Sequence, residues 1–484
     1  MEHSESKRLV RNTLFSVLTR GSAIADLILL VLAARYLGDE KYGQLSFAFA
    51  VVFIFQFVAD FGLKDLLIRE IARKKEHTRQ WIKRALSIKA GLAVLTFVLV
   101  WITTVFLPII TEVQIVIWLL TFGMVIKMFK LLLRGVINAH ERFDLEGILV
   151  LTERIMFLLV CGGLLVCGYG LVSFATGFAI IQFGTLMVWV FVIYRTLRGE
   201  EKEEPLNLPL LRVVKQAIPF GLSYAGMAVY FRLDSIMLGL IRGDVEVGWY
   251  NAAYRIIEGL LVIPYIFYNV LFPRFSILHQ GSNSSIRGLT ERGCKYLVAL
   301  AVVITLVGVI GANQWIAILY GPGYGHAALP LQILLLSTIF MFVWVVFVVL
   351  LNSINHPGIP LVGVLLGAAT NALLNFFLIP DYGYVGASVA TVIADVGLVT
   401  FLYFGLVSCG YRIRFFEIAM KPIAAGLFVG LASLFLIQMN AGLLAILCGV
   451  MYVGVLLITG FLDQKEMTLL QDFAASLRLG FRRS

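Results

Sequence analysis

Three basic side chains interrupt an apolar run that ends at residue 134. Lys127, Lys130 and Arg134 follow the spacing i, i+3 and i+7, so a helix would carry them on one face. Guanidinium groups bind phosphate oxygens in pairs, and ammonium groups act as point charges. The stripe could therefore bind an anion that contains phosphate. The alternative is that Lys127, roughly 10 Å from the end of the run, reaches the bilayer surface with its long side chain.

A second polar group falls in two later apolar runs. Asn251, Arg255 and Glu258 share one helical face, and Arg232 and Asp234 lie in the second half of the preceding run. We expect Arg255, assisted by Arg232, to form a central anion site. Asp234 or Glu258 would compete for the guanidinium groups so that the anion can leave. Two plainer interpretations stay open: a charge pair of Arg232 with Asp234, and an i,i+3 ion pair of Arg255 with Glu258.

Two carboxylates stand in the first two apolar runs. Asp26 lies in the middle of the first run, and Asp60 shares a face of the second with Phe49 and Phe53. A charged side chain at the centre of a bilayer costs about 2.5 to 3.5 kcal/mol on insertion scales, so such groups face a cavity or a partner. We expect Asp26 and Asp60 to face a substrate cavity. The phenylalanines could stack on sugar rings or face lipid.

Composition shows what must position these charges. Of the 484 residues, 60% are hydrophobic and only 14% are charged, whereas about a quarter are charged in soluble domains. A spanning helix needs roughly 20 mostly apolar residues. The chain has fourteen such runs, near 12–34, 43–63, 85–107, 113–134, 147–168, 171–194, 213–240, 247–272, 293–311, 327–351, 358–379, 384–408, 415–438 and 441–461. The sequence predicts an all-α polytopic membrane protein with about 14 transmembrane helices.

Lysine and arginine set the expected orientation. Basic residues favour the cytoplasmic side of a membrane, and they gather in alternate loops of this chain, such as 64–84 and 195–215. This asymmetry predicts that both termini are cytoplasmic and that the protein lies in the cell (cytoplasmic or inner) membrane. It also accounts for most of the net charge of +10, so no nucleic-acid partner is expected. The five cysteines show no CxxC spacing, and we expect no metal site and no cofactor.

An internal repeat organises the chain. Gly38, Asp39 and Gly43 recur as Gly243, Asp244 and Gly248, each displaced by 205 positions with six apolar runs between them. An even number of spans keeps the orientation, which predicts two parallel six-helix lobes around a central cavity plus two extra C-terminal helices. The expected divisions are 1–200 for the N-terminal lobe, 201–212 for a cytoplasmic linker, 213–410 for the C-terminal lobe, and 411–484 for spans 13 and 14 with a cytoplasmic tail.

Two prolines interrupt the runs that carry the second polar group. Pro219 and Pro264 remove backbone hydrogen bonds and bend helices. We expect them to act as hinges, with a static kink as the alternative. Na⁺ or H⁺ could couple to the movement, and isolated Asp395 could bind such a cation or stay neutral.

Several segments resemble a known family of membrane transporters. These are "AARYLGDEKYGQLSFAFA" followed by "DFGLKDLLIREIA", then "RLDSIMLG", "VGWYNAAYRI" and "VLFPRFS". The chain resembles the polysaccharide-transport branch of the multidrug/oligosaccharidyl-lipid/polysaccharide (MOP) exporter superfamily, which includes the O-antigen-type flippases. The resemblance implies two lobes around a cavity, alternating access, and transfer of a lipid-linked oligosaccharide from the cytoplasmic to the outer leaflet.

The expected function is therefore a flippase for a lipid-(di)phosphate-linked oligosaccharide in cell-surface polysaccharide biosynthesis. Its partners would be this substrate, membrane lipids and the polysaccharide polymerase or glycosyltransferase machinery. An ion-coupled multidrug exporter of the same superfamily is the first alternative, and its cavity should be less cationic. A membrane polysaccharide polymerase or ligase is the second alternative. The expected outer loop near 312–326 is short and nearly uncharged, which leaves little room for such a catalytic site.

The repeat makes a testable prediction about topology. An impermeant thiol reagent should label cysteines introduced at Asp39 and Asp244 from outside intact cells, because an even number of spans separates the two sites. Cysteines at Lys75 and Lys202 should be protected until the membrane is permeabilised. Opposite labelling of the first two sites would contradict the parallel repeat.

Overall fold

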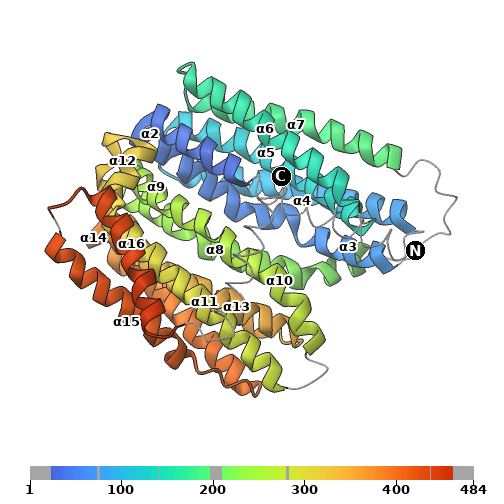
Figure 1. Cartoon of the computed structure of the whole chain (residues 1–484). Coiled ribbons are helices and arrows are strands. Elements are labelled where there is room, and N and C mark those ends of the chain that lie inside the picture. The colour runs from blue at the N-terminus through green and yellow to red at the C-terminus, as the bar shows by residue number, and fades with distance from the viewer. Residues whose placement is uncertain are drawn as a thin grey trace, which may run out of the picture. The chain divides into compact units, whose positions relative to one another are not determined.

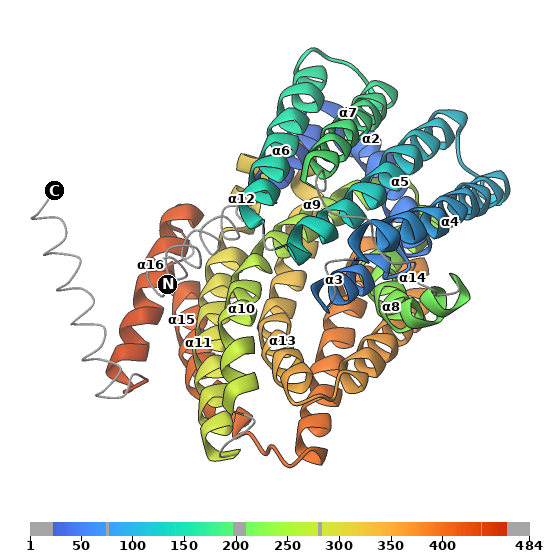
Figure 2. The ribbon, with the colours of Figure 1, turned by 90° about the vertical axis from the view of Figure 1, so that its right-hand side faces the viewer.

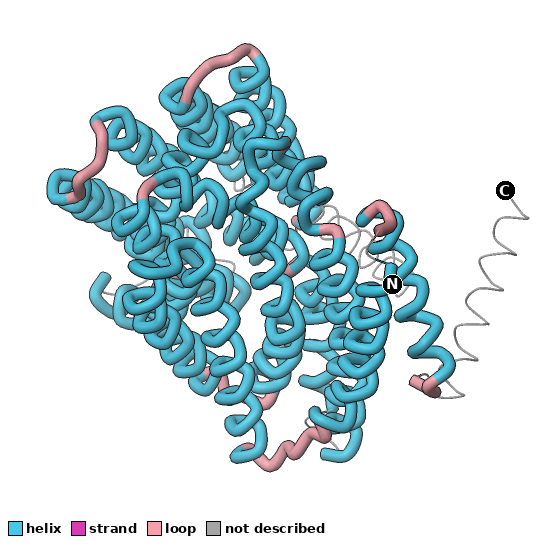
Figure 3. The backbone as a smooth tube through the Cα atoms, turned by 90° about the vertical axis from the view of Figure 1, so that its left-hand side faces the viewer, coloured by secondary structure: helices cyan, strands magenta, loops and turns pink. Residues whose placement is uncertain are grey.

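The chain folds into helices throughout the part that can be described. The computed structural model describes residues 23–73, 77–140, 142–196, 210–278, 283–436 and 438–461, and no strand occurs among them (Figure 3). Residues 201–209 of the predicted linker 201–212 and the tail from 462 lie outside these ranges. The all-α prediction is confirmed.

The helices follow one another with short connections. In chain order they are α2 Ala23–Asp60, α3 Leu63–Arg73, α4 Thr78–Phe106, α5 Thr111–Ala139, α6 Phe143–Val166, α7 Leu171–Thr196, α8 Leu210–Arg242, α9 Asp244–Leu260, α10 Val262–Leu278, α11 Asn283–Ile310, α12 Ala312–Tyr320, η2 Pro322–Ala327, α13 Ala328–Ser353, α14 Gly358–Ser408, α15 Phe415–Ser433, η3 Leu434–Leu436 and α16 Ala441–Ile458.

Eleven helical segments of the described residues are long and apolar enough to cross a membrane. Two of them, Ile24–Ile71 and Gly358–Ser408, contain 48 and 51 residues, more than twice the roughly 20 residues that one crossing needs. The run predicted as span 8 is divided between α9 and α10, which have 17 residues each. These lengths accommodate fourteen crossings, and that number stays a prediction.

The chain divides into two compact units. The first comprises residues 1–262, 316–330 and 361–394, and the second comprises 263–315, 331–360 and 395–484. This division differs from the predicted lobes because α8 and α9 pack against α2 and so join the first unit. The lobe boundaries inferred from the repeat stay a prediction.

In the first unit, α5, α6 and α7 lie side by side, and α2 contacts all three (Figures 1 and 2). The second unit contains α11, α15 and α16 in mutual contact. There the Tyr452 hydroxyl donates a hydrogen bond to the Ala299 carbonyl at 3.1 Å, and the Ser337 hydroxyl donates to buried Asp395. The cavity described below belongs to the first unit alone.

The repeated glycine motif has the same backbone conformation at both positions. Gly38 has φ 78° and ψ 173°, and Gly243 has φ 93° and ψ 179°. This left-handed region favours glycine because a Cβ atom would clash there. Gly38 bends α2 in its middle, and Gly243 separates α8 from α9. The sequence repeat is thus a repeat of structure at these turns.

The two turns also meet each other. A Cβ atom at Gly43 would lie 1.8 Å from the carbonyl oxygen of Asp244, and one at Gly248 would lie 2.2 Å from the carbonyl oxygen of Asp39. Each repeat therefore presents its second glycine to the other repeat's aspartate. Such a reciprocal pair of contacts is what a two-fold relation between similar surfaces produces.

Side chains extend the same reciprocity. The Trp249 indole donates a hydrogen bond to the Asp39 carboxylate at 3.1 Å, and the Gln44 amide interacts with the Asp244 carboxylate. Gln44 and Trp249 are themselves 205 positions apart. Partial burial raises the pKa of Asp244 above its usual range, and the Gln44 contact opposes this effect.

We predict that the α2–α9 contact tolerates no side chain at its glycines. Gly43→Ala should destabilise the protein by about 1 to 3 kcal/mol, because the methyl group overlaps a backbone oxygen that cannot rotate away. The measurement is thermal unfolding of the purified protein in detergent. The matched control is Gly163→Ala in α6, where no heavy atom lies within 4 Å of the added Cβ. Equal melting temperatures for the two variants would contradict the prediction.

Candidate functional site

A cavity of about 240 Å³ lies among α2, α5, α6, α7, α8 and α9 in the first unit. Its charged lining residues are Asp26, Lys127, Lys130, Arg134, Glu153, Arg154, Arg232 and Arg255. Most of its other lining side chains are apolar or aromatic. The described lining therefore combines six cations with two carboxylates inside an otherwise apolar wall.

The basic stripe of α5 faces this cavity, as its spacing predicts. The Lys130 ammonium pairs with Glu153 at 2.8 Å and donates to the Thr185 hydroxyl at 2.8 Å, while Arg134 pairs with Glu146. Lys127 forms no ion pair or hydrogen bond with the described residues, although Glu153 attracts its charge. Lys127 lines the cavity, as the anion-binding interpretation of the stripe expects.

Asp26 also lines the cavity, and its partner there is a residue that the predicted site did not include. The Arg154 guanidinium of α6 forms an ion pair with the Asp26 carboxylate of α2. Arg154 and its neighbour Glu153 both stand inside an apolar run, so the rule that selected the other intramembrane charges could have found them.

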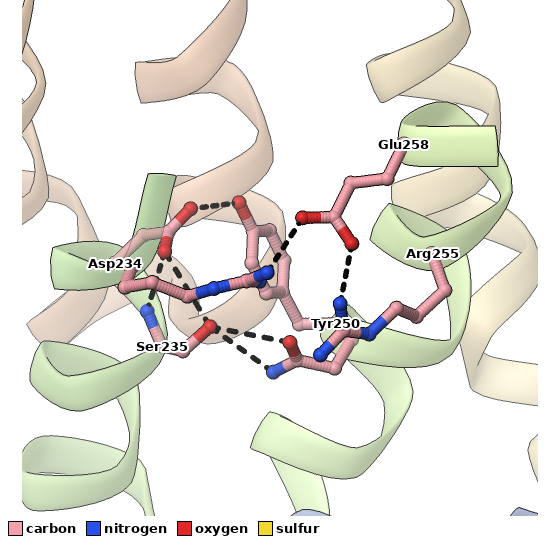
Figure 4. Close-up of polar contacts among 7 residues, drawn as sticks. Asp234, Ser235, Tyr250, Arg255 and Glu258 are labelled. Carbon is pink, nitrogen blue, oxygen red and sulfur yellow. Dashed lines mark hydrogen bonds and ion pairs between the residues drawn. The ribbon is translucent and has the colours of Figure 1, made fainter. Parts of the chain in front are cut away.

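Arg232 and Arg255 share one carboxylate. One carboxylate oxygen of Glu258 forms an ion pair with Arg255 Nη1 at 2.5 Å. The other forms an ion pair with Arg232 Nη2 at 2.8 Å (Figure 4). Arg232 also lies over the Phe53 ring, 5.0 Å from its centre. The intrahelical pair of Arg255 with Glu258 is present, but it is one half of a three-residue bridge between α8 and α9.

Asp234 and Asn251 belong to a buried network beside the cavity, and neither lines it. The Tyr250 hydroxyl and the Ser235 backbone N–H donate to Asp234, and Asn251 donates to the Ser235 hydroxyl at 3.1 Å (Figure 4). The Tyr250 hydroxyl also lies 3.3 Å from that of Thr391 in α14. Asp234 thus has hydroxyl and N–H partners, and the plainer interpretation of an ion pair with Arg232 does not describe it.

Asp60 is placed differently from the prediction. Its carboxylate pairs with Lys89 of α4 at 2.9 Å, both side chains are at most 5% exposed, and Asp60 does not line the cavity. Burial of two charges requires such mutual pairing.

The two prolines expected to act as hinges lie at different places in their helices. Pro264 follows directly on the interruption at Leu261 that separates α9 from α10. Pro219 lies inside α8, and its side chain is outside the described residues. Whether either residue moves stays a prediction.

The chain matches one family of known proteins over much of its length. The model of a family described as polysaccharide biosynthesis proteins matches residues 9–279, more than half of the chain. The chain belongs to this polysaccharide biosynthesis protein family.

Solved structures of two membrane transporters have the same fold as this family member. A lipid II flippase MurJ in an inward closed conformation matches with a TM-score of 0.75 at 15% identity, over 93% of this chain and 99% of that one. An inward-facing MATE multidrug transporter of the MOP superfamily matches with a TM-score of 0.65 at 14% identity, over 80% and 94%. The fold expected from the MOP resemblance is confirmed.

Curated relatives of this polysaccharide biosynthesis protein include two from Haloferax volcanii. A probable flippase, AglR, is 28% identical over 34% of this chain and 35% of its own length. A probable low-salt glycan biosynthesis flippase, Agl15, is 22% identical over 75% of each chain. The chain thus spans about a third of AglR and three quarters of Agl15 in these alignments.

We predict that Glu258 is needed to hold the two arginines together. Glu258→Gln should lower stability by about 2 kcal/mol, because it removes the charge that both partly buried guanidinium groups share. Thermal unfolding in detergent measures this loss. Glu417→Gln is the control, since Glu417 is 69% exposed and 3.6 Å from exposed Arg414. A drop no larger than that of the control would show that Glu258 is dispensable for packing.

Proposed function

We propose that this protein is a flippase that moves a lipid-linked oligosaccharide, joined to its lipid through phosphate, from the cytoplasmic to the outer leaflet by alternating access. The observation that carries the proposal is the cavity with six cationic lining residues inside a membrane-spanning unit. The family and the flippase names of AglR and Agl15 support the same class of substrate.

The charge of the cavity favours an anion. Glu146 and Glu258 pair with lining arginines and raise the number of carboxylates around the six cations to four among the described residues. The excess of positive charge suits phosphate groups, which cannot cross hydrocarbon without partners. It disfavours the cationic drugs expected for the multidrug-exporter alternative.

Most of these cations are already paired, and this has a consequence for binding. Lys127 can meet an anion without first leaving a carboxylate within the described structure, so we propose it as the first contact. Arg232 and Arg255 would follow by exchanging Glu258 for phosphate. Return of the carboxylate to the arginines would then help release, because transport requires an affinity that is not too high.

We further propose that the protein lies in the cell membrane with both termini cytoplasmic, as the distribution of lysine and arginine indicates. Glycosyltransferases would supply the substrate on one side, and a polysaccharide polymerase or transferase would consume it on the other. A coupling cation, Na⁺ or H⁺, is proposed to act at a buried carboxylate such as Asp395.

Lys127→Ala tests the proposal without breaking an ion pair. In a host that lacks its own copy of this gene, the variant should restore less than about a tenth of the surface glycan at normal membrane abundance, because the cavity loses its available cation. Lys83→Ala, which removes an exposed lysine of α4, should restore it fully. Full surface glycan with Lys127→Ala would remove Lys127 from the binding site.

A further inference from the structure

One face of α7 lines the cavity with aromatic and amide side chains. Phe174, Phe178, Gln182 and Trp189 lie at i, i+4, i+8 and i+15, which brings them onto one side of the helix. Phe178 stacks on Phe157 of α6, with ring centres 5.3 Å apart. The α7 face is therefore a largely aromatic wall that contains one neutral polar group.

Gln182 is deeply buried in this wall. The residue is 1% exposed, and its amide oxygen accepts no hydrogen bond from the described residues. A buried amide without a partner costs about 1 to 3 kcal/mol. A glutamine at this position is therefore a poor choice for packing alone and a good one for contact with a ligand.

The chemistry of an amide differs from that of every charged group around it. Lysine and arginine side chains only donate hydrogen bonds, and the lining carboxylates Asp26 and Glu153 are held by Arg154 and Lys130. An amide oxygen needs a donor, which an ionised phosphate diester lacks. Hydroxyl groups and acetamido N–H groups of a sugar supply such donors, and an aromatic wall with few polar groups is a typical ligand-binding surface.

The α7 face is also next to the basic stripe of α5. Thr185, one turn after Gln182, accepts the 2.8 Å hydrogen bond from Lys130 of α5. A ligand whose phosphate contacts the α5 stripe therefore has its next chemical group within reach of Gln182. In a lipid-linked oligosaccharide, that group is the first sugar.

We infer that Gln182 is a specificity-determining residue that recognises the first sugar of the substrate through a hydroxyl or acetamido N–H group, against the aromatic face of α7. This inference rests on the proposed function. It adds that two different parts of the cavity bind two different parts of the substrate. The α5 stripe binds phosphate, and the α7 face distinguishes a glycosylated lipid from a bare one.

The test compares two ligands on the purified protein in nanodiscs. The probes are a polyprenyl diphosphate and the same lipid carrying one N-acetylglucosamine. Gln182→Leu should weaken binding of the glycosylated lipid roughly three- to tenfold, the ratio that one neutral hydrogen bond gives, and leave the bare lipid unchanged. Gln56→Leu is the matched control, because Gln56 is another glutamine with an unpartnered amide oxygen that does not line the cavity.

Each remaining outcome has a distinct meaning. Equal binding losses for both lipids, or no loss for either, would overturn the role of Gln182 while leaving a phosphate-binding flippase in place. Binding of neither lipid by the unmodified protein would overturn the proposed function and this inference with it. A purely structural glutamine would lower the melting temperature when replaced, so thermal unfolding accompanies every titration. Gln182→Met serves as a second variant should Gln182→Leu fail to fold.

Discussion

The two glycine turns meet backbone to backbone, and the cavity depends on this contact. Gly43 and Gly248 bring the backbones of α2 and α9 together at distances that no side chain permits. Arg255 and Glu258 come from α9, while Asp26, Phe49 and Phe53 come from α2. The contact between backbones therefore sets how far apart these two sets of cavity side chains can lie.

The cost of charge in a bilayer explains the rest of the arrangement. Every lining cation except Lys127 has a carboxylate partner among the described residues, and each pair joins two different helices or two turns of one helix. Unpaired, these charges would have a high free-energy cost inside the bilayer. As ion pairs they help to hold the helices together. The pairs fix the helices around the cavity and keep it polar enough for an anion.

Local patterns in the sequence predicted much of this structure. The spacing of Lys127, Lys130 and Arg134 defines a face within a single helix, so it survives folding unchanged. The repeated Gly38 and Gly243 share one backbone conformation for a similarly local reason, because a left-handed position favours glycine wherever it occurs. Helical character and approximate spans follow from apolar runs, whereas the exact number of crossings depends on kinks such as that at Gly383.

Contacts between distant segments were not predictable in the same way. Asp60 was expected in the cavity, but Lys89 neutralises it, and nothing in either sequence neighbourhood specifies that the two helices meet there. Asp234 was likewise expected in the cavity, whereas the fold places it beside the cavity and brings Tyr250 to it. Gln182 carries no charge and so gave no signal until its burial was known.

The bridge made by Glu258 has a consequence for the electrical work of transport. Four carboxylates around six cations leave an excess of two positive charges in the described cavity. A diphosphate diester, with one negative charge on each phosphate, would cancel that excess. The membrane potential does about 2.3 kcal/mol of work on each unit charge per 100 mV. The membrane potential would therefore do almost no work on an occupied cavity, and reorientation of the loaded protein would be nearly independent of voltage.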